Sequence, residues 1–457
     1  MLDFTLHSPE SVGVRSDAIR AFLAHGHQLG LHSLIMLRHG KCITESYFTP
    51  YAPHKRHRLY SLSKSFTSIA CAFAVQEGLL SYEDKVADFF PDKIIPEEKK
   101  DLTVEHLLTM SVGTDETDRF SGIDWVQDFL SAVPEHTPGT VFRYDTSSTF
   151  MVAAILTRVI GRSLECYLTD KLFTPLGIDE HHWELSPESY CQGGVGLNLR
   201  ARDIARFGQF MLQRGKWEGK QLLDAALIDR ATTKHIENGT PIPGQPCDWA
   251  MGYGYQFWHC EPDAVYRGDG AFGQYCIMLP NQDMVIVTNS GTRDMQKILT
   301  VLWQEFLPAV SDTPLPEEDA ALSALRQAEL SCHITYPDGT PLSPDACGDY
   351  TLGDVTLRLL MEQDELRIYR MNGNKPHLLL RAGFGRWIDC GERSYTYACE
   401  GATIHLREVY HFAPFGHQHD LVMNGTTLVE STSSFSGCVD PSFDIFVSNL
   451  GSGSIIY

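Results

Sequence analysis

Hydrophobic and polar positions follow a helical period in some parts of the chain and a strand period in others. A helical spacing over residues 16–29 precedes two apolar runs, 33–37 and 42–47, which predict strands joined by a turn. The middle of the chain is mostly helical, and its expected helices are 103–110, 124–133, 149–160, 164–172 and 201–214. Strand-like runs return at 253–259, 273–279 and 284–288, followed by a helix over 294–306. The pattern predicts one α/β domain interrupted by a helical insertion.

A change of composition after residue 310 predicts a second domain. The segment SDTPLPEEDA has two prolines, four acidic residues and few apolar ones, as is typical of a linker. Short strand-like runs with turns between them follow at 352–361, 365–371, 376–381, 401–409 and 419–423. We therefore expect a domain over residues 1–310 with a helical insertion at about 100–245, a linker at 311–320 and a small C-terminal β domain over 321–457.

Ser61-Leu62-Ser63-Lys64 carries the clearest chemical signal in the chain. At the start of a helix, a serine and a lysine one turn later share a face, so the amine can activate the hydroxyl for acyl transfer. The pattern is common by chance, because any helix can hold a capping serine and a solvated lysine. Here the small and apolar run 65–74 follows the lysine, which predicts a buried ammonium group.

A nucleophilic serine also needs a base, and the strongest candidate segment is 137–148. A Pro-Gly turn there leads into Tyr144 just ahead of the predicted helix 149–160. Without further information, an aromatic ring that packs at the entrance of a helix is the simpler interpretation of this tyrosine.

Several short motifs occur together in an order that resembles one known superfamily. They are Ser11-Val12-Gly13, SLSKSFT, VEHLLTM at 104–110, PGTVFRYDT, Pro175-Leu176-Gly177, Gly193-Gly194-Val195-Gly196-Leu197 and DIARFG at 203–208. Over residues 8–308 the chain resembles the class C β-lactamase and penicillin-recognising serine hydrolases, whose relatives include esterases, D-aminopeptidases and 6-aminohexanoate-dimer hydrolase. The resemblance implies an antiparallel sheet flanked by helices. It also implies Ser61 as nucleophile, Lys64 as the amine that handles its proton, Tyr144 as general base and the Ser61 N–H as one oxyanion donor.

Two motifs depart from the pattern of that superfamily. The usual Tyr-x-Asn is Tyr144-Asp145-Thr146 here, so a hydroxyl replaces the amide that helps to hold substrate and lysine. The third motif, usually Lys-Thr-Gly or His-x-Gly, falls near residues 266–275 without a lysine or histidine. We assign Asp269, Gly270 and Ala271 to substrate binding, with the Ala271 N–H as second oxyanion donor and Gly268 as the alternative. Arg267 and Asp269 could equally form only an ion pair in a turn.

Charge and composition exclude several kinds of partner. A net charge of −21 argues against nucleic acid and against an anionic membrane surface. The residues after Met1 do not form a leader, and no apolar run reaches the length of a membrane span, so we expect a cytoplasmic protein. His417 and His419 lie outside any metal-binding motif, so we expect surface or loop histidines and no metal or organic cofactor.

The sequence therefore predicts a serine hydrolase that cleaves a small ester, an amide or a short peptide through an acyl-serine intermediate. Two alternatives remain open, namely a slow-turnover binder or sensor of β-lactams or peptidoglycan fragments, and a transacylase that uses an acceptor other than water. Trp125, Tyr190 and Trp249 are candidates for shaping the pocket.

Overall fold

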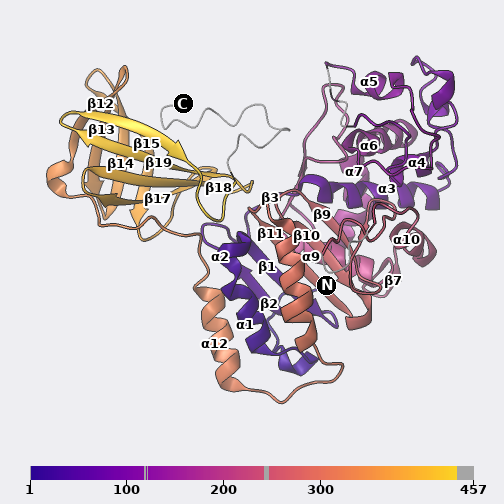
Figure 1. Ribbon diagram of the computed structural model, residues 1–457, viewed down its shortest axis with the longest axis horizontal. Coiled ribbons are helices and arrows are strands. Elements are labelled where there is room, and N and C mark those ends of the chain that lie inside the picture. The colour runs from indigo at the N-terminus through magenta and orange to yellow at the C-terminus, as the bar shows by residue number, and fades with distance from the viewer. Residues whose placement is uncertain (1, 118–119, 121, 241–245, 440–457) are drawn as a thin grey trace.

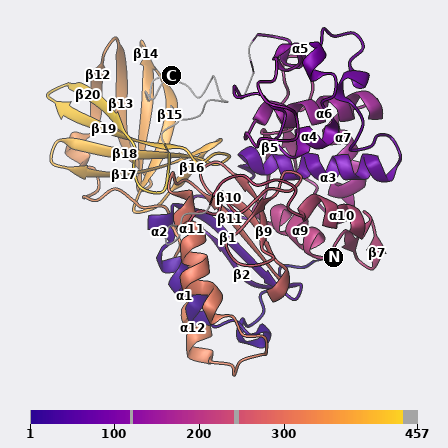
Figure 2. The same ribbon diagram turned by 45° about the vertical axis from the view of Figure 1, so that its right-hand side comes forward.

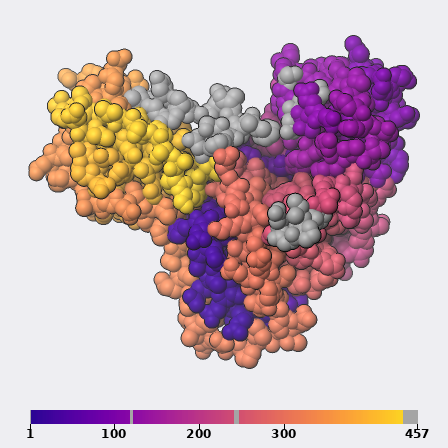
Figure 3. All heavy atoms as spheres, viewed as in Figure 1, coloured from indigo at the N-terminus to yellow at the C-terminus, as the bar shows by residue number. Residues whose placement is uncertain are grey.

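A computed structural model of the chain describes residues 2–117, 120, 122–240 and 246–439. Figure 1 shows three regions: a sheet with helices packed on it, a helical region and a C-terminal β-barrel. In the space-filling view the helical region and the barrel form two separate lobes beside the sheet region (Figure 3). Within the described residues, none of the helices has the length and hydropathy that a membrane span requires.

The central sheet is antiparallel and has the strand order β2-β1-β11-β10-β9-β8. Its strands are β1 (Leu31–Arg38), β2 (Lys41–Tyr47), β8 (Trp258–His259), β9 (Tyr266–Gly270), β10 (Gln274–Leu279) and β11 (Met284–Ser290). Every residue of β1 is buried because helices cover both faces of the sheet. Leu34 packs with α1 (Ser16–Ala24) and α11 (Met295–Val301), whereas Ile35 packs on the other face with α3 (Ser63–Gln76) and α9 (Ala201–Leu212). Figure 2 shows α1, α11 and α12 (Asp319–Leu330) together on the first of these faces.

The insertion between β2 and β8 is mainly helical, as predicted. Its helices are α3 (Ser63–Gln76), α4 (Val104–Leu108), α5 (Trp125–Ser131), α6 (Thr146–Ile160), α7 (Leu164–Leu168), α8 (Thr174–Leu176), α9 (Ala201–Leu212) and α10 (Ala225–Thr232), and its short strands are β3 (His57–Arg58), β4 (His182–Trp183), β5 (Leu197–Leu199), β6 (Lys216–Trp217) and β7 (Lys220–Gln221). Helix α6 begins earlier than predicted because Asp145 caps it, accepting a hydrogen bond from the Ser147 N–H at 2.9 Å. Residues 241–245, at the predicted end of the insertion, lie outside the described residues. The α/β fold with a helical insertion is confirmed.

The C-terminal β region is a barrel. Among the described residues nine strands form one sheet, and the parallel pairing of β15 with β17 closes it. The strands are β12 (Gly348–Leu352), β13 (Val355–Glu362), β14 (Glu365–Asn372), β15 (Lys375–Phe384), β16 (Ile388–Cys390), β17 (Arg393–Glu400), β18 (Thr403–Tyr410), β19 (Gly416–Asn424) and β20 (Thr427–Ser433). The predicted linker 311–320 ends inside α12 (Asp319–Leu330), which packs on α1 and β2 through Leu325. Residues 440–457 lie outside the described part of the chain.

The expectation that His417 and His419 are surface or loop histidines is wrong. Both lie on β19, and their exposed fractions are 4% and 1%. They occupy alternate positions of the strand together with Leu421, which belongs to the apolar interior of the barrel. Their side chains therefore point into the barrel. The sequence did not predict this placement, because polar residues interrupt the apolar alternation of the strand.

The turn between β18 and β19 joins the barrel to the N-terminal region. The Phe412 carbonyl accepts a hydrogen bond from the Arg58 N–H at 2.7 Å, and the Ala413 carbonyl accepts one from the Tyr51 hydroxyl at 3.0 Å. An ion pair between Lys55 and Asp389, with an N–O distance of 3.1 Å, lies at the same interface. The barrel is thus hydrogen-bonded directly to the segment that precedes Ser61.

Stability at this interface should depend on the protonation of His411. Its Nε2 lies 3.2 Å from the Lys55 amine, which can donate only to a neutral imidazole. Burial and the positive charge of Lys55 lower the pKa of His411 to about 4, against the opposing effect of Asp389. In the unfolded chain the pKa is about 6.5, so between these values the unfolded state binds more protons and stability falls as pH falls.

We expect the melting temperature of the wild type to drop relative to that of His411→Gln as pH is lowered from 7 to 4.5. Thermal unfolding of both proteins across this range measures the difference. A constant difference between the two curves would contradict a neutral, buried His411.

Candidate active site

A short 3₁₀ turn, Tyr60–Leu62, places Ser61 directly before helix α3. Lys64 lies one turn further on, and its amine donates a hydrogen bond to the Ser61 hydroxyl at 3.0 Å. Ser61 is half-buried, and the exposed fraction of Lys64 is only 2%. The two residues that the sequence predicted as nucleophile and activating amine are therefore in direct contact, with the amine shielded from bulk water.

Lys64 also contacts acceptors other than Ser61. Its amine lies 3.2 Å from the Thr146 hydroxyl and 3.0 Å from the Gly194 carbonyl oxygen. The hydroxyl that replaces the usual asparagine thus still contacts the lysine. The sequence did not predict the contact between the Gly194 carbonyl and Lys64, because no chemical role was assigned to the glycine-rich segment. The Thr67 hydroxyl donates a hydrogen bond to the neighbouring Gly193 carbonyl at 2.9 Å.

Tyr144 lies at the same site. The Lys64 amine is 4.9 Å from the centroid of its ring, close enough for a cation–π contact. The ring also lies 5.3 Å from that of Trp258 and 6.4 Å from that of Tyr253. The Lys64 amine therefore places a positive charge directly against the ring of Tyr144. Ser61, Lys64 and Tyr144 are brought together.

Strand β9 runs against the turn that carries the nucleophile. A Cβ atom at Gly270 would come within 2.0 Å of the Leu59 carbonyl oxygen, and one at Gly268 within 2.5 Å of the Ser65 hydroxyl. Only glycine permits this close approach of the two segments. Ala271, the first residue after β9, therefore lies beside the turn that contains Ser61.

Arg267 and Asp269 form an ion pair within strand β9 and not in a turn. The Arg267 Nη2 and the Asp269 Oδ2 are 3.0 Å apart, and both side chains are almost completely buried. Arg267 also donates to the carbonyl of His259 at 3.0 Å. Burial raises the pKa of Asp269, while the charges of Arg267 and Lys64 oppose this shift. Asp269 therefore lies near the site, but Arg267 already offsets its charge.

Two residues with left-handed backbone flank the predicted oxyanion donors. Tyr60, directly before Ser61, has φ = 48°, and Phe272, directly after Ala271, has φ = 69°. Such conformations cost free energy in residues other than glycine and need support from their surroundings. The rings of Tyr60 and Phe272 pack edge to face at 5.3 Å, and Phe415 of the barrel lies 6.0 Å from Phe272. The barrel therefore supports the backbone on both sides of the site.

Replacing Phe415 by leucine should lower kcat about 10-fold, because the aromatic contact that holds Phe272 is lost while much of the buried volume remains. Phe22→Leu is a matched control, since Phe22 of α1 is also buried but packs on the face of the sheet opposite to α3. Ester hydrolysis and thermal unfolding of both variants provide the measurement. Equal kcat values in the two variants would show that the barrel does not support the site.

The three aromatic candidates for the pocket lie in different places. Trp249 stacks near the Arg267 guanidinium at 4.8 Å and lies 6.5 Å from Trp258, which contacts Tyr144. Trp125 and Tyr190 instead pack against Phe150 of α6, with ring centroids 5.4 Å and 6.2 Å away. Of the three, Trp249 belongs to the group of rings around Tyr144.

The N-terminal part of the chain is similar in sequence to known proteins. A family model described as "Beta-lactamase" matches residues 16–303, more than half of the chain. The chain is 25% identical over 290 residues to a β-lactamase of Yersinia enterocolitica, covering 57% of this chain and 70% of that protein. It is 23% identical over 288 residues to a 6-aminohexanoate-dimer hydrolase of Paenarthrobacter ureafaciens, covering 57% of this chain and 73% of that protein.

Solved structures resemble the fold of most of the chain. The octameric penicillin-binding protein homologue of Pyrococcus abyssi has a TM-score of 0.53 and 16% identity, covering 91% of this chain and 99% of that one. At this identity the likeness concerns the fold alone. The family match over residues 16–303 shows that the chain belongs to the β-lactamase family, whose members are generally hydrolytic enzymes.

Proposed function

We propose that the protein is a serine hydrolase that cleaves an ester or amide through an acyl-enzyme on Ser61. The observation that carries this proposal is the 3.0 Å hydrogen bond between the buried Lys64 amine and the Ser61 hydroxyl. Burying an ammonium group costs free energy unless neighbouring groups stabilise its charge. The neighbours of the Lys64 amine are a hydroxyl at the start of a helix and the ring of Tyr144. This combination is the usual arrangement of an activated serine.

In the proposed reaction Tyr144 acts as a phenolate and takes the proton of the Ser61 hydroxyl, while the Lys64 ammonium group stabilises the serine alkoxide. The serine oxygen attacks the substrate carbonyl carbon, and the negative oxygen of the tetrahedral intermediate accepts hydrogen bonds from the N–H groups of Ser61 and Ala271. Collapse of this intermediate breaks the bond to the alcohol or amine, which leaves with the proton held by Tyr144. Water then gives a proton to Tyr144 as it attacks the acyl-serine, and Tyr144 returns this proton to the Ser61 oxygen as the acid leaves.

The charges around the site favour a neutral substrate over one that carries a carboxylate. Arg267 is fully buried in its pair with Asp269, and Arg143 pairs with Asp115 at 3.1 Å. Neither arginine is positioned to replace the lysine or histidine of the third motif. A lost charged hydrogen bond to a carboxylate is worth about 1.5–3 kcal/mol, or roughly 10- to 150-fold in affinity.

A substrate panel tests this proposal on one enzyme preparation. The panel contains a short p-nitrophenyl ester, a D-alanine amide and benzylpenicillin. We expect the ester to have a higher kcat/KM than benzylpenicillin. Continuous product release would support a hydrolase, whereas a stoichiometric burst that stops would indicate a slow β-lactam binder. Benzylpenicillin matching the ester would contradict the argument about the missing cation.

Replacing Tyr144 by phenylalanine should leave the fold intact and lower kcat by about 10²- to 10⁴-fold, because the ring remains and only the proton acceptor is lost. Tyr253→Phe is the control, since Tyr253 is buried in the same group of rings. Wild-type activity in Tyr144→Phe, with an unchanged melting temperature, would leave Tyr144 as a packing residue.

A further inference from the structure

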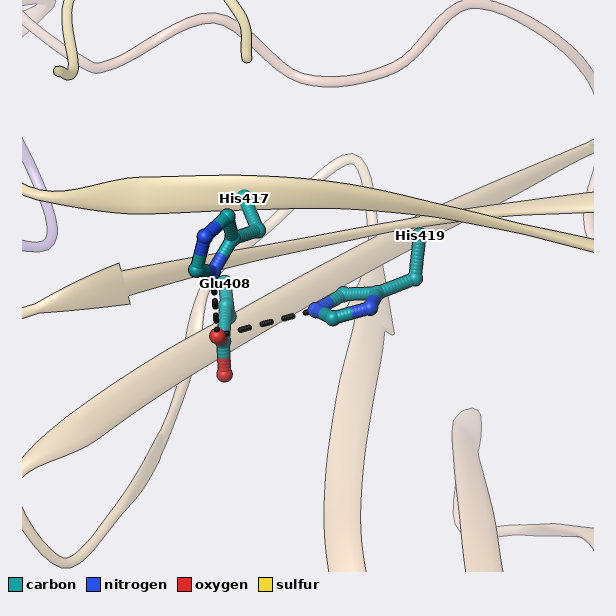
Figure 4. A group of neighbouring side chains, drawn as sticks. All are labelled: Glu408, His417 and His419. Carbon is teal, nitrogen blue, oxygen red and sulfur yellow. Dashed lines mark hydrogen bonds and ion pairs between the residues drawn. The ribbon is translucent and has the colours of Figure 1, made fainter. Parts of the chain in front are cut away.

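A group of titratable side chains lies inside the barrel, apart from the site at Ser61. Glu408 on β18 pairs directly across the sheet with His417 on β19, and His419 follows two positions later (Figure 4). All three are buried and share the inner face of their strands with Leu406 and Leu421 of the apolar interior. Carboxylate and imidazole groups in such a place need a compensating partner.

The three side chains converge on one point. The Glu408 Oε1 lies 3.0 Å from the His417 Nδ1 and 3.6 Å from the His419 Nε2, and all three ligand atoms lie within 4.8 Å of one another. Metal–ligand bonds of about 2.0–2.1 Å place two ligand atoms of a tetrahedral zinc ion about 3.3 Å apart. The two distances from the Glu408 Oε1 are close to this spacing, so small side-chain movements would bring the three atoms into the geometry of a zinc site.

The surrounding contacts prepare these groups to act as ligands. The His419 Nδ1 lies 2.9 Å from a Glu430 carboxylate oxygen, and an acceptor there requires Nδ1 to carry the proton. In this neutral tautomer the lone pair of Nε2 faces the Glu408 Oε1, which is 3.6 Å away. Arg393 lies 3.2 Å from the other Glu408 oxygen and leaves Oε1 turned toward the histidines. A carboxylate behind a histidine is a recurrent feature of zinc sites.

We propose that Glu408, His417 and His419 bind one divalent transition-metal ion, of which zinc best suits a ligand set of two imidazoles and one carboxylate. Three protein ligands leave one position of a tetrahedral ion to water. The positive charge of such an ion would compensate the buried Glu408 carboxylate and bind the two imidazole nitrogens.

The place of this site in the barrel suggests its role. Glu408 and His417 lie at the two ends of the turn whose residues Phe412 and Phe415 contact the segments next to Ser61. An ion that links β18 to β19 would fix this turn and, through it, Phe272. The proposed metal is therefore structural and does not take part in the acyl transfer.

A proton is the competing occupant. Burial lowers the pKa of His419, but hydrogen bonds and charges from Glu408 and Glu430 outweigh this effect and raise it to about 9. A protonated His419 would satisfy Glu408 without any metal, and the experiment has to separate the two states.

The full chain, dialysed against a chelator and then against buffer, is titrated with Zn²⁺ at pH 7.5. We expect one Zn²⁺ per chain by elemental analysis and a higher melting temperature with Zn²⁺ than without, since binding to the folded state alone stabilises it. Glu408→Gln and His419→Gln should lose both effects. His405→Gln is the matched control, because His405 pairs with Asp420 on the other face of the same two strands and should retain them.

Co²⁺ gives a readout on the wild type that does not depend on the folding of any variant. One equivalent should produce the visible absorption bands of a tetrahedral site, and one equivalent of Zn²⁺ should remove them. Absence of these bands, or Zn²⁺ binding that is equal in wild type and His419→Gln, would overturn the proposal and leave the proton as the occupant.

Discussion

Replacing Ser61 by alanine should abolish covalent labelling by a fluorophosphonate and lower kcat/KM for a p-nitrophenyl ester by about 10⁴- to 10⁶-fold. The acyl-enzyme needs one hydroxyl, and the Ser61 oxygen is the one that accepts a hydrogen bond from the buried Lys64 amine. Alanine removes that oxygen from a half-buried position without adding volume, so the fold should persist. Labelling kinetics and steady-state hydrolysis of the same preparations provide the measurement.

Ser63→Ala is the matched control for the register of the motif. Ser63 is completely buried, and its hydroxyl accepts a hydrogen bond from the Leu197 N–H at 3.2 Å, so its loss should reduce stability and leave labelling nearly unchanged. Wild-type labelling in Ser61→Ala together with none in Ser63→Ala would place the nucleophile two residues later.

Replacing Lys64 by methionine should lower kcat by about 10³-fold or more, with a smaller change in KM. Methionine fills a similar volume but cannot donate to Ser61, Thr146 and the Gly194 carbonyl, nor place a cation beside Tyr144. Without the Lys64 cation, no positive charge beside Ser61 and Tyr144 would stabilise the transfer of the serine proton. Single-turnover acylation rates at several pH values measure the effect.

Lys99→Met controls for the loss of a buried lysine as such. Lys99 has an exposed fraction of 1%, donates to the Phe129 carbonyl and lies 4.0 Å from the centroid of the Phe129 ring. Its replacement should affect the melting temperature and leave acylation unchanged. A similar fall of kcat in Lys64→Met and Lys99→Met would mean that Lys64 acts only through stability.

Local patterns in the sequence predicted the elements that carry the candidate site. The apolar run after Lys64 predicted a buried helix, and α3 is buried from Ser63 to Ala74. The Pro-Gly turn and the polar residues after Tyr144 predicted a helix entrance, although the cap at Asp145 shifted its start. Such features depend on neighbours in the sequence and are therefore accessible without a structure.

Features that depend on distant contacts could not be predicted in this way. The turn at 410–415 reaches Phe272 only because the barrel packs against the sheet region. The pairing of Glu408 with His417 depends on the register of a hairpin, which the scattered polar residues of these strands did not specify. The contact between Gly194 and Lys64 likewise joins two segments that are 130 residues apart.

Peptide mapping by mass spectrometry after fluorophosphonate treatment of the full chain identifies the nucleophile. We expect one adduct per chain, located on Ser61, and loss of ester hydrolysis in proportion to the labelled fraction. An adduct on another residue, or full activity in a completely labelled protein, would contradict the assignment of Ser61 as the nucleophile.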